Sequence, residues 1–119
     1  MKEVILGTDG DSVIYSVPDE VANNLRKYCL RFGNEWIQKS PDAAKYRIKD
    51  EDGEVCAAYC EADFIEYLNT WVFPDQPSVF VKNIGWTQFG RKLPSEYQGY
   101  PCFHFLRRKN RLIERRAVH

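Results

Sequence analysis

Three cysteines and a histidine are the residues in this chain whose types could together bind a metal. Cys56, Cys60, Cys102 and His104 offer three thiols and one imidazole, which suffice for a tetrahedral zinc site. Cys56 lies in a predicted strand, however, where side chains four residues apart are separated by about 13 Å. Structural zinc sites instead use close pairs of ligands on tight turns. We therefore predict buried thiols with no metal and no cofactor, and whether the four residues approach one another stays open.

A second candidate for chemistry is the segment Asp9-Gly10-Asp11-Ser12, which follows an apolar strand. It resembles the Asp-x-Asp loop of haloacid-dehalogenase-type phosphotransferases, which would imply a carboxylate nucleophile and a magnesium ion. Those enzymes also need a downstream lysine and a larger, doubly wound sheet. Here Ser12–Val17 has the pattern of a returning strand, which favours a hairpin turn. A Cys–His pair built on His104 lacks a recognisable third member, so we predict that the protein is not an enzyme.

Aromatic and basic residues are interleaved in a segment rich in glycine and proline. Tyrosine, tryptophan and arginine carry much of the binding energy at protein interfaces. Large aromatic side chains also anchor irregular segments, so packing is the alternative to binding. We predict a partner-binding loop formed by Trp86, Phe89, Arg91, Lys92, Tyr97 and Tyr100.

The charge of the chain is unevenly distributed. Residues 107–119 hold six basic side chains against one acid, a net charge of +5, so residues 1–106 carry −5 in a chain that is neutral overall. Such a tail is suited to binding nucleic-acid phosphates or an acidic protein surface. The alternative is a solvated tail that makes no specific contact. The basic residues that would contact nucleic acid or an acidic partner are Arg107, Arg108, Lys109, Arg111, Arg115 and Arg116.

The elements that must position these residues follow from periodicity. Two predicted hairpins turn at Asp9–Asp11 and Asp50–Gly53, and each precedes an amphipathic helix that ends before a proline. The two hairpin–helix segments align with each other at an offset of 43 residues, which reflects either an internal repeat or chance. We predict an α+β fold whose antiparallel sheet is built from the two hairpins, with the two helices on one face (ββα-ββα).

The remainder of the chain has weaker periodicity. Residues 77–84 fit either a short helix or a strand, 86–100 a loop held by its aromatic residues, and 103–105 a short strand. We predict one domain over residues 1–106. The basic tail, residues 107–119, is predicted to form a terminal helix.

The length and composition limit the location and the function. No apolar stretch approaches the length of a membrane span or a signal peptide, so we predict a cytoplasmic protein that does not associate with membranes. The expected function is a small non-enzymatic interaction module of the inhibitor, immunity or regulatory-subunit type. It would bind another protein through the aromatic–basic loop and its charged surfaces. The alternative is a nucleic-acid-binding accessory protein that uses the basic tail.

Overall fold

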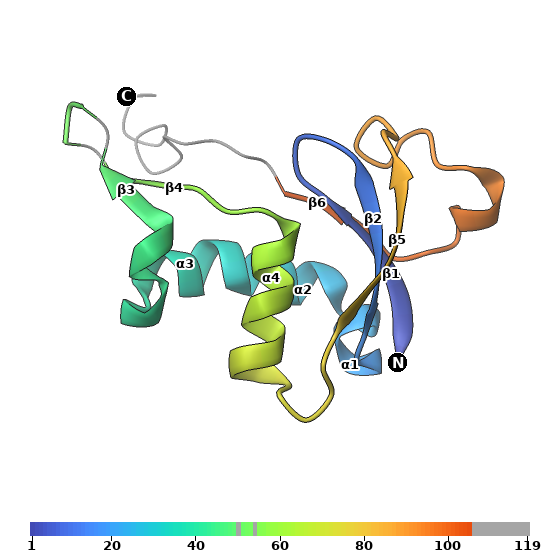
Figure 1. Cartoon of the computed structure of the whole chain (residues 1–119), viewed down its shortest axis with the longest axis horizontal. Coiled ribbons are helices and arrows are strands. Elements are labelled where there is room, and N and C mark those ends of the chain that lie inside the picture. The colour runs from blue at the N-terminus through green and yellow to red at the C-terminus, as the bar shows by residue number, and fades with distance from the viewer. Residues whose placement is uncertain (50, 54, 106–119) are drawn as a thin grey trace.

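The computed structural model describes residues 1–49, 51–53 and 55–105, which form a mixed α+β fold around a four-stranded sheet (Figure 1). The strand order is β5-β2-β1-β6. Strand β2 is antiparallel to β1 and to β5, whereas β6 runs parallel to β1. The strands are β1 (Lys2–Gly7), β2 (Ser12–Val17), β5 (Val79–Gly85) and β6 (Cys102–His104).

The hairpin of β1 and β2 is the centre of the sheet, and the predicted turn at Asp9–Asp11 is confirmed. Alternate residues of a strand face opposite sides, and here both sides are covered. Val4 and Leu6 pack into the main core with the helices. Ile5 and Ile14 are paired and buried, and they point to the opposite side, where the segment of residues 86–101 lies (Figure 1).

The helix predicted after Pro18 is folded as several consecutive pieces. Its first break is at Asn24, whose backbone leaves the helical region and whose side-chain amide donates to the carbonyl of Glu20. Asparagine favours such breaks because its side chain competes for backbone hydrogen bonds. The pieces are α1 (Asp19–Asn23), α2 (Leu25–Arg31), a π-helical turn (Phe32–Trp36), α3 (Ile37–Lys39) and a 3₁₀ helix (Pro41–Tyr46).

The second hairpin, β3 (Arg47–Lys49) and β4 (Val55–Ala57), forms a separate two-stranded sheet. The prediction of one antiparallel sheet built from both hairpins is therefore wrong. The reason is that the two edges of the β1–β2 hairpin are taken by β6 and β5, which come from later in the chain. Helix α4 (Glu61–Tyr67) follows β4 and continues into a π-helical turn (Leu68–Val72).

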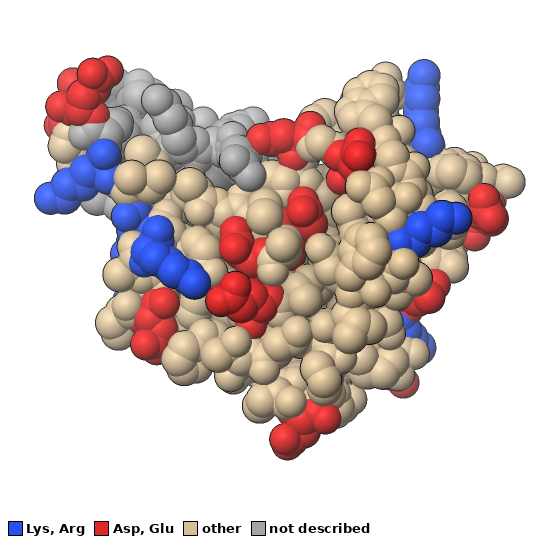
Figure 2. All heavy atoms as spheres, in the orientation of Figure 1, with Lys and Arg blue, Asp and Glu red and all other residues tan. Residues whose placement is uncertain are grey.

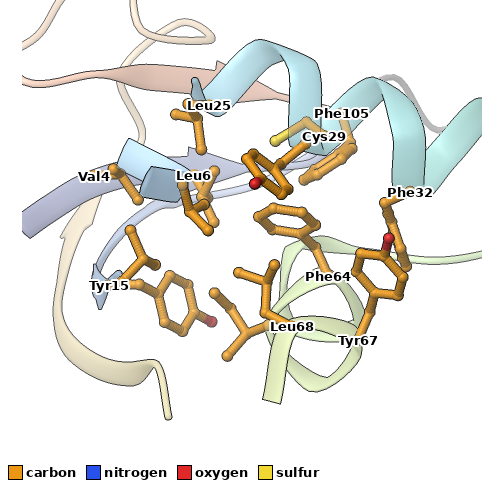
Figure 3. Close-up of a cluster of buried hydrophobic side chains, with 14 of the residues drawn as sticks. Val4, Leu6, Tyr15, Leu25, Cys29, Phe32, Phe64, Tyr67, Leu68 and Phe105 are labelled. Carbon is orange, nitrogen blue, oxygen red and sulfur yellow. The ribbon is translucent and has the colours of Figure 1, made fainter. Parts of the chain in front are cut away.

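The main core lies between the four-stranded sheet and the helices (Figure 3). Phe64 of α4 is fully buried near its middle, with Leu6 and Tyr15 of the sheet on one side and Phe32 and Tyr67 on the other. Because aromatic rings bury a large apolar area and prefer edge-to-face contacts, this cluster ties the helices to the sheet.

Three predictions for the C-terminal third have different outcomes. Residues 79–85 form a strand, so the strand alternative is confirmed over the helix, and 86–101 form a loop with one short 3₁₀ turn, Ser95–Tyr97. The predicted basic helix and its arginines, residues 107–119, lie outside the described residues. Every helix in the described part is too short or too polar to cross a bilayer.

Candidate functional site

A chain of hydrogen bonds, buried at Ser12 and Thr87 and exposed at Cys102, connects the loop to the sheet at His104. Ser12 Oγ lies 2.7 Å from Thr87 Oγ1 and 2.9 Å from His104 Nε2, and His104 Nδ1 lies 3.5 Å from Cys102 Sγ. The backbone N–H of Gly90 donates to Thr87 Oγ1 at 3.1 Å. These residues come from β2, the loop and β6, so the chain fixes the loop against the sheet.

One donor in this hydrogen-bond chain is fixed by its chemistry. The N–H of Gly90 can only donate, so Thr87 Oγ1 accepts from it. A hydroxyl can accept two hydrogen bonds and donate one, so either Ser12 or Thr87 can be the donor between them. The direction of the Ser12–His104 bond depends on the tautomer of the imidazole: Ser12 donates to Nε2 when the ring proton is on Nδ1, and accepts from it otherwise.

Partial desolvation keeps the two titratable members of this chain, His104 and Cys102, uncharged. Desolvation lowers the pKa of His104 below its ordinary value of 6.5, and the nearby carboxylate of Glu61 opposes this shift only in part. Desolvation also raises the pKa of the Cys102 thiol. His104 is therefore a neutral imidazole and Cys102 a thiol at neutral pH.

Acidification is expected to destabilise the protein through His104. Its pKa is lower in the folded than in the unfolded state, so the unfolded chain binds the proton first and stability falls as pH decreases through about 6.5. The slope is at most about 1.4 kcal/mol per pH unit for one group. Urea unfolding between pH 7.5 and 5.5 measures this slope. His104→Gln keeps an acceptor for Ser12 but cannot titrate, so an equal slope in this variant would contradict the assignment.

Two glycines hold the imidazole from both sides. A Cβ atom at Gly7 would lie 2.6 Å from Cδ2 of His104, and one at Gly90 would lie 2.9 Å from Sγ of Cys102 and 3.2 Å from Cε1 of His104. Gln88, Phe89 and Gly90 all have positive φ angles, of 53°, 57° and 86°. A bulky residue such as Phe89 rarely adopts this conformation, so the turn is strained. This turn places the Phe89 ring edge-to-face with the His104 ring, with 6.1 Å between the ring centroids.

A cavity of about 520 Å³ opens beside this turn, between α2 and β6. Cys102 and His104 lie on its β6 side, and the exposed ring of Phe89 lies on its loop side. The two remaining polar residues are arginines from different elements. The lining is Arg26, Phe89, Arg91, Cys102, Phe103 and His104.

The structure divides the predicted partner-binding loop into separate parts. Phe89 and Arg91 line the cavity, whereas Tyr97 and Tyr100 contact each other edge-to-face at 5.3 Å in another part of the loop. The hydroxyl of Tyr100 donates to Glu3 at 3.2 Å. The side chains of Trp86 and Lys92 are exposed, but neither lines the cavity.

Four exposed apolar side chains lie on β5 and directly after its end. Val79, Phe80 and Val81 of the edge strand β5 are 53%, 61% and 41% exposed, and Trp86 is 61% exposed. We call these four residues the β5 surface. Sequence reasoning missed the three residues of β5. The apolar run Val79–Val81 was visible, but only the sheet order shows that it lies at an edge.

The other candidates for chemistry do not converge. Cys102 and His104 are adjacent, but no three potential metal ligands cluster in the part of the chain that the structure describes. Asp9 and Asp11 border a shallow hollow with Cys60 and Glu61 at the predicted hairpin turn. No protein-family model matches the chain, and no curated protein or solved structure shows detectable similarity to it.

Proposed function

We propose that the protein is a cytoplasmic, non-enzymatic interaction module that binds a partner protein through the β5 surface. The observation that carries this proposal is the exposure of two large aromatic side chains, Phe80 on the edge strand β5 and Trp86 directly after its end. Folded monomers rarely expose large contiguous apolar patches, and those that do generally use them for binding. Four free cysteines suit a reducing compartment such as the cytoplasm.

The geometry of β5 favours a partner that covers its side chains over a partner that adds a strand to its free edge. Unprotected edge strands can pair with another chain, and proteins limit this with bulges and charged residues. The pairing of β5 with β2 skips Val81 and Ile84, which gives two irregularities, and Lys82 lies between them. A partner is therefore expected to cover Phe80 and Trp86 rather than to continue the sheet.

Electrostatic steering would assist this binding. Acidic side chains gather over α4 on the face shown in Figure 2, where Glu61, Asp63 and Glu66 lie on that helix. An acidic face raises the rate of encounter with a basic partner, and this attraction weakens as salt is added. We therefore expect a partner with an apolar centre and a basic rim.

The chemistry near His104 supports binding rather than covalent catalysis. A nucleophilic cysteine needs a lowered pKa or a base able to take its proton. Desolvation instead raises the pKa of Cys102 and lowers the pKa of His104, which makes His104 a weaker base toward the thiol. Ser12, whose hydroxyl contacts His104, is fully buried and therefore out of reach of a substrate.

Replacing Trp86 by alanine is expected to reduce partner affinity by about tenfold or more, because buried tryptophans are common binding hot spots. A tagged protein is used to isolate the partner from the source cell, with nuclease present. The affinity of the identified partner is then measured by calorimetry. Trp71→Ala is the matched control, since Trp71 is similarly exposed but lies on the π-helical turn after α4.

The proposal requires that Trp86→Ala and Phe80→Ala weaken binding while Trp71→Ala changes it by less than about twofold. Equal losses in the two tryptophan variants would contradict it. Release of every partner by nuclease would also contradict it and would favour the basic tail. Recovery of only a second copy of the chain would show self-association instead.

A further inference from the structure

The cavity beside His104 is lined by strand β6, which lies at the opposite edge of the sheet from β5. None of the four residues of the β5 surface is among those that line it. The interaction proposed for the β5 surface therefore does not use the lining of the cavity. Any function of the cavity is separate and can be tested separately.

The charge of the cavity comes from its two arginines. Arg26 projects from α2 and Arg91 from the loop, and neither forms an ion pair with a described residue. Among the described residues, no acidic side chain belongs to the lining. His104 and Cys102 add no charge of their own at neutral pH. The lining thus carries two positive charges without a described counterion.

The rest of the lining is suited to a flat apolar group. Phe89 and Phe103 contribute two aromatic rings from the loop and from β6, and the strained turn holds Phe89 in place over His104. The volume, about 520 Å³, lies within the usual range for small-molecule sites. Guanidinium groups match carboxylate and phosphate oxygens through paired hydrogen bonds.

We propose that the cavity between α2 and β6 binds a small anion with a planar apolar body. Arg26 and Arg91 hold its carboxylate or phosphate group, and Phe89 and Phe103 pack against its ring. This site requires both parts of the ligand, because two arginines alone would retain only a weakly bound ion in water. The shared chemistry is an aromatic carboxylate or an aromatic phosphate ester.

The test is a titration of the full chain with 2-naphthoate and, separately, with 1-naphthyl phosphate, followed by NMR. We expect amide shifts at β6 and at residues 87–91 with both probes, and shifts with only one of them would identify the preferred anion. Neutral 2-naphthalenemethanol is expected to bind at least about tenfold more weakly, because it lacks the charge-assisted hydrogen bonds. Cys102 provides a second readout: the bound probe should slow its alkylation by iodoacetamide.

Matched variants separate the cavity from a general effect of charge. Arg26→Gln and Arg91→Gln should each weaken naphthoate binding by about tenfold. Lys27→Gln and Lys92→Gln remove the same charge from neighbouring exposed residues that do not line the cavity, so they should change binding by less than about twofold.

Three results would overturn the proposal. Equal losses in the lysine and arginine variants would show diffuse attraction, and equal binding of the neutral alcohol would show that no anion is recognised. Shifts confined to β5 would place the probe on the other surface. None of these results bears on the Trp86 experiment, so the two proposals fail independently.

Discussion

Replacing Phe32 with alanine is expected to lower the free energy of unfolding by about 3–5 kcal/mol. Phe32 is fully buried, so the truncation removes a whole ring from the core and leaves a cavity. Its ring centroid lies 5.1 to 6.0 Å from five other aromatic rings, which come from its own π-helical turn, α4 and the segments after β4 and β6. Loss of Phe32 therefore weakens contacts between elements throughout the chain.

Urea unfolding followed by tryptophan fluorescence measures this effect. Phe80→Ala is the control of the same type, because Phe80 is largely exposed, and it should change stability by at most about 0.5 kcal/mol. If the alanine variant does not fold, Phe32→Leu retains most of the volume and should cost less than about 1.5 kcal/mol. Similar stabilities for Phe32→Ala and Phe80→Ala would show that the aromatic cluster is not the centre of the core.

Gly7→Ala is expected to cost about 2–4 kcal/mol through a single added methyl group. The new Cβ atom would lie 2.6 Å from Cδ2 and 2.9 Å from Nε2 of His104, and 3.2 Å from the carbonyl oxygen of Asp11. The imidazole cannot retreat easily, because Gly90 closes its other side. Its displacement breaks the 2.9 Å hydrogen bond to Ser12, which is fully buried.

Gly10→Ala is the matched control for this substitution. Gly10 lies in the turn of the same hairpin, but a Cβ atom there meets nothing within 4 Å, so we expect almost no change. The double variant Gly7→Ala/His104→Ala removes the ring that the methyl group meets. Its cost should be smaller than the sum of the two single costs. Additive costs would mean that the imidazole is not what excludes a side chain at residue 7.

Local patterns in the sequence were sufficient for the elements whose partners lie nearby. The first hairpin follows from alternating apolar residues around Asp9–Asp11, and the α4 region from its spaced apolar residues and the proline beyond it. The long helix was predicted as one piece, although Asn24 carried a signal for the break. Propensity favours asparagine outside helix interiors, and the apolar stripe on both sides concealed it.

Pairing between distant segments could not be predicted in this way. Nothing within residues 79–85 or 102–104 shows that they flank the first hairpin, so the second hairpin was wrongly added to the sheet. The same limit applies to the site. Ser12 is 75 residues from Thr87 and 92 residues from His104, and only the folded sheet brings their side chains together.

The parallel pairing of β6 with β1 has a consequence for the order in which the protein forms. Strand β1 opens the chain, but one of its edges is closed by residues 102–104, so this contact spans nearly all of the described sequence. Contacts between distant residues slow folding, because a long loop must close first. During synthesis the ribosome therefore releases the apolar segment of β1 long before its last neighbour exists. In that interval, the nascent chain exposes an apolar, aggregation-prone strand to which chaperones can bind.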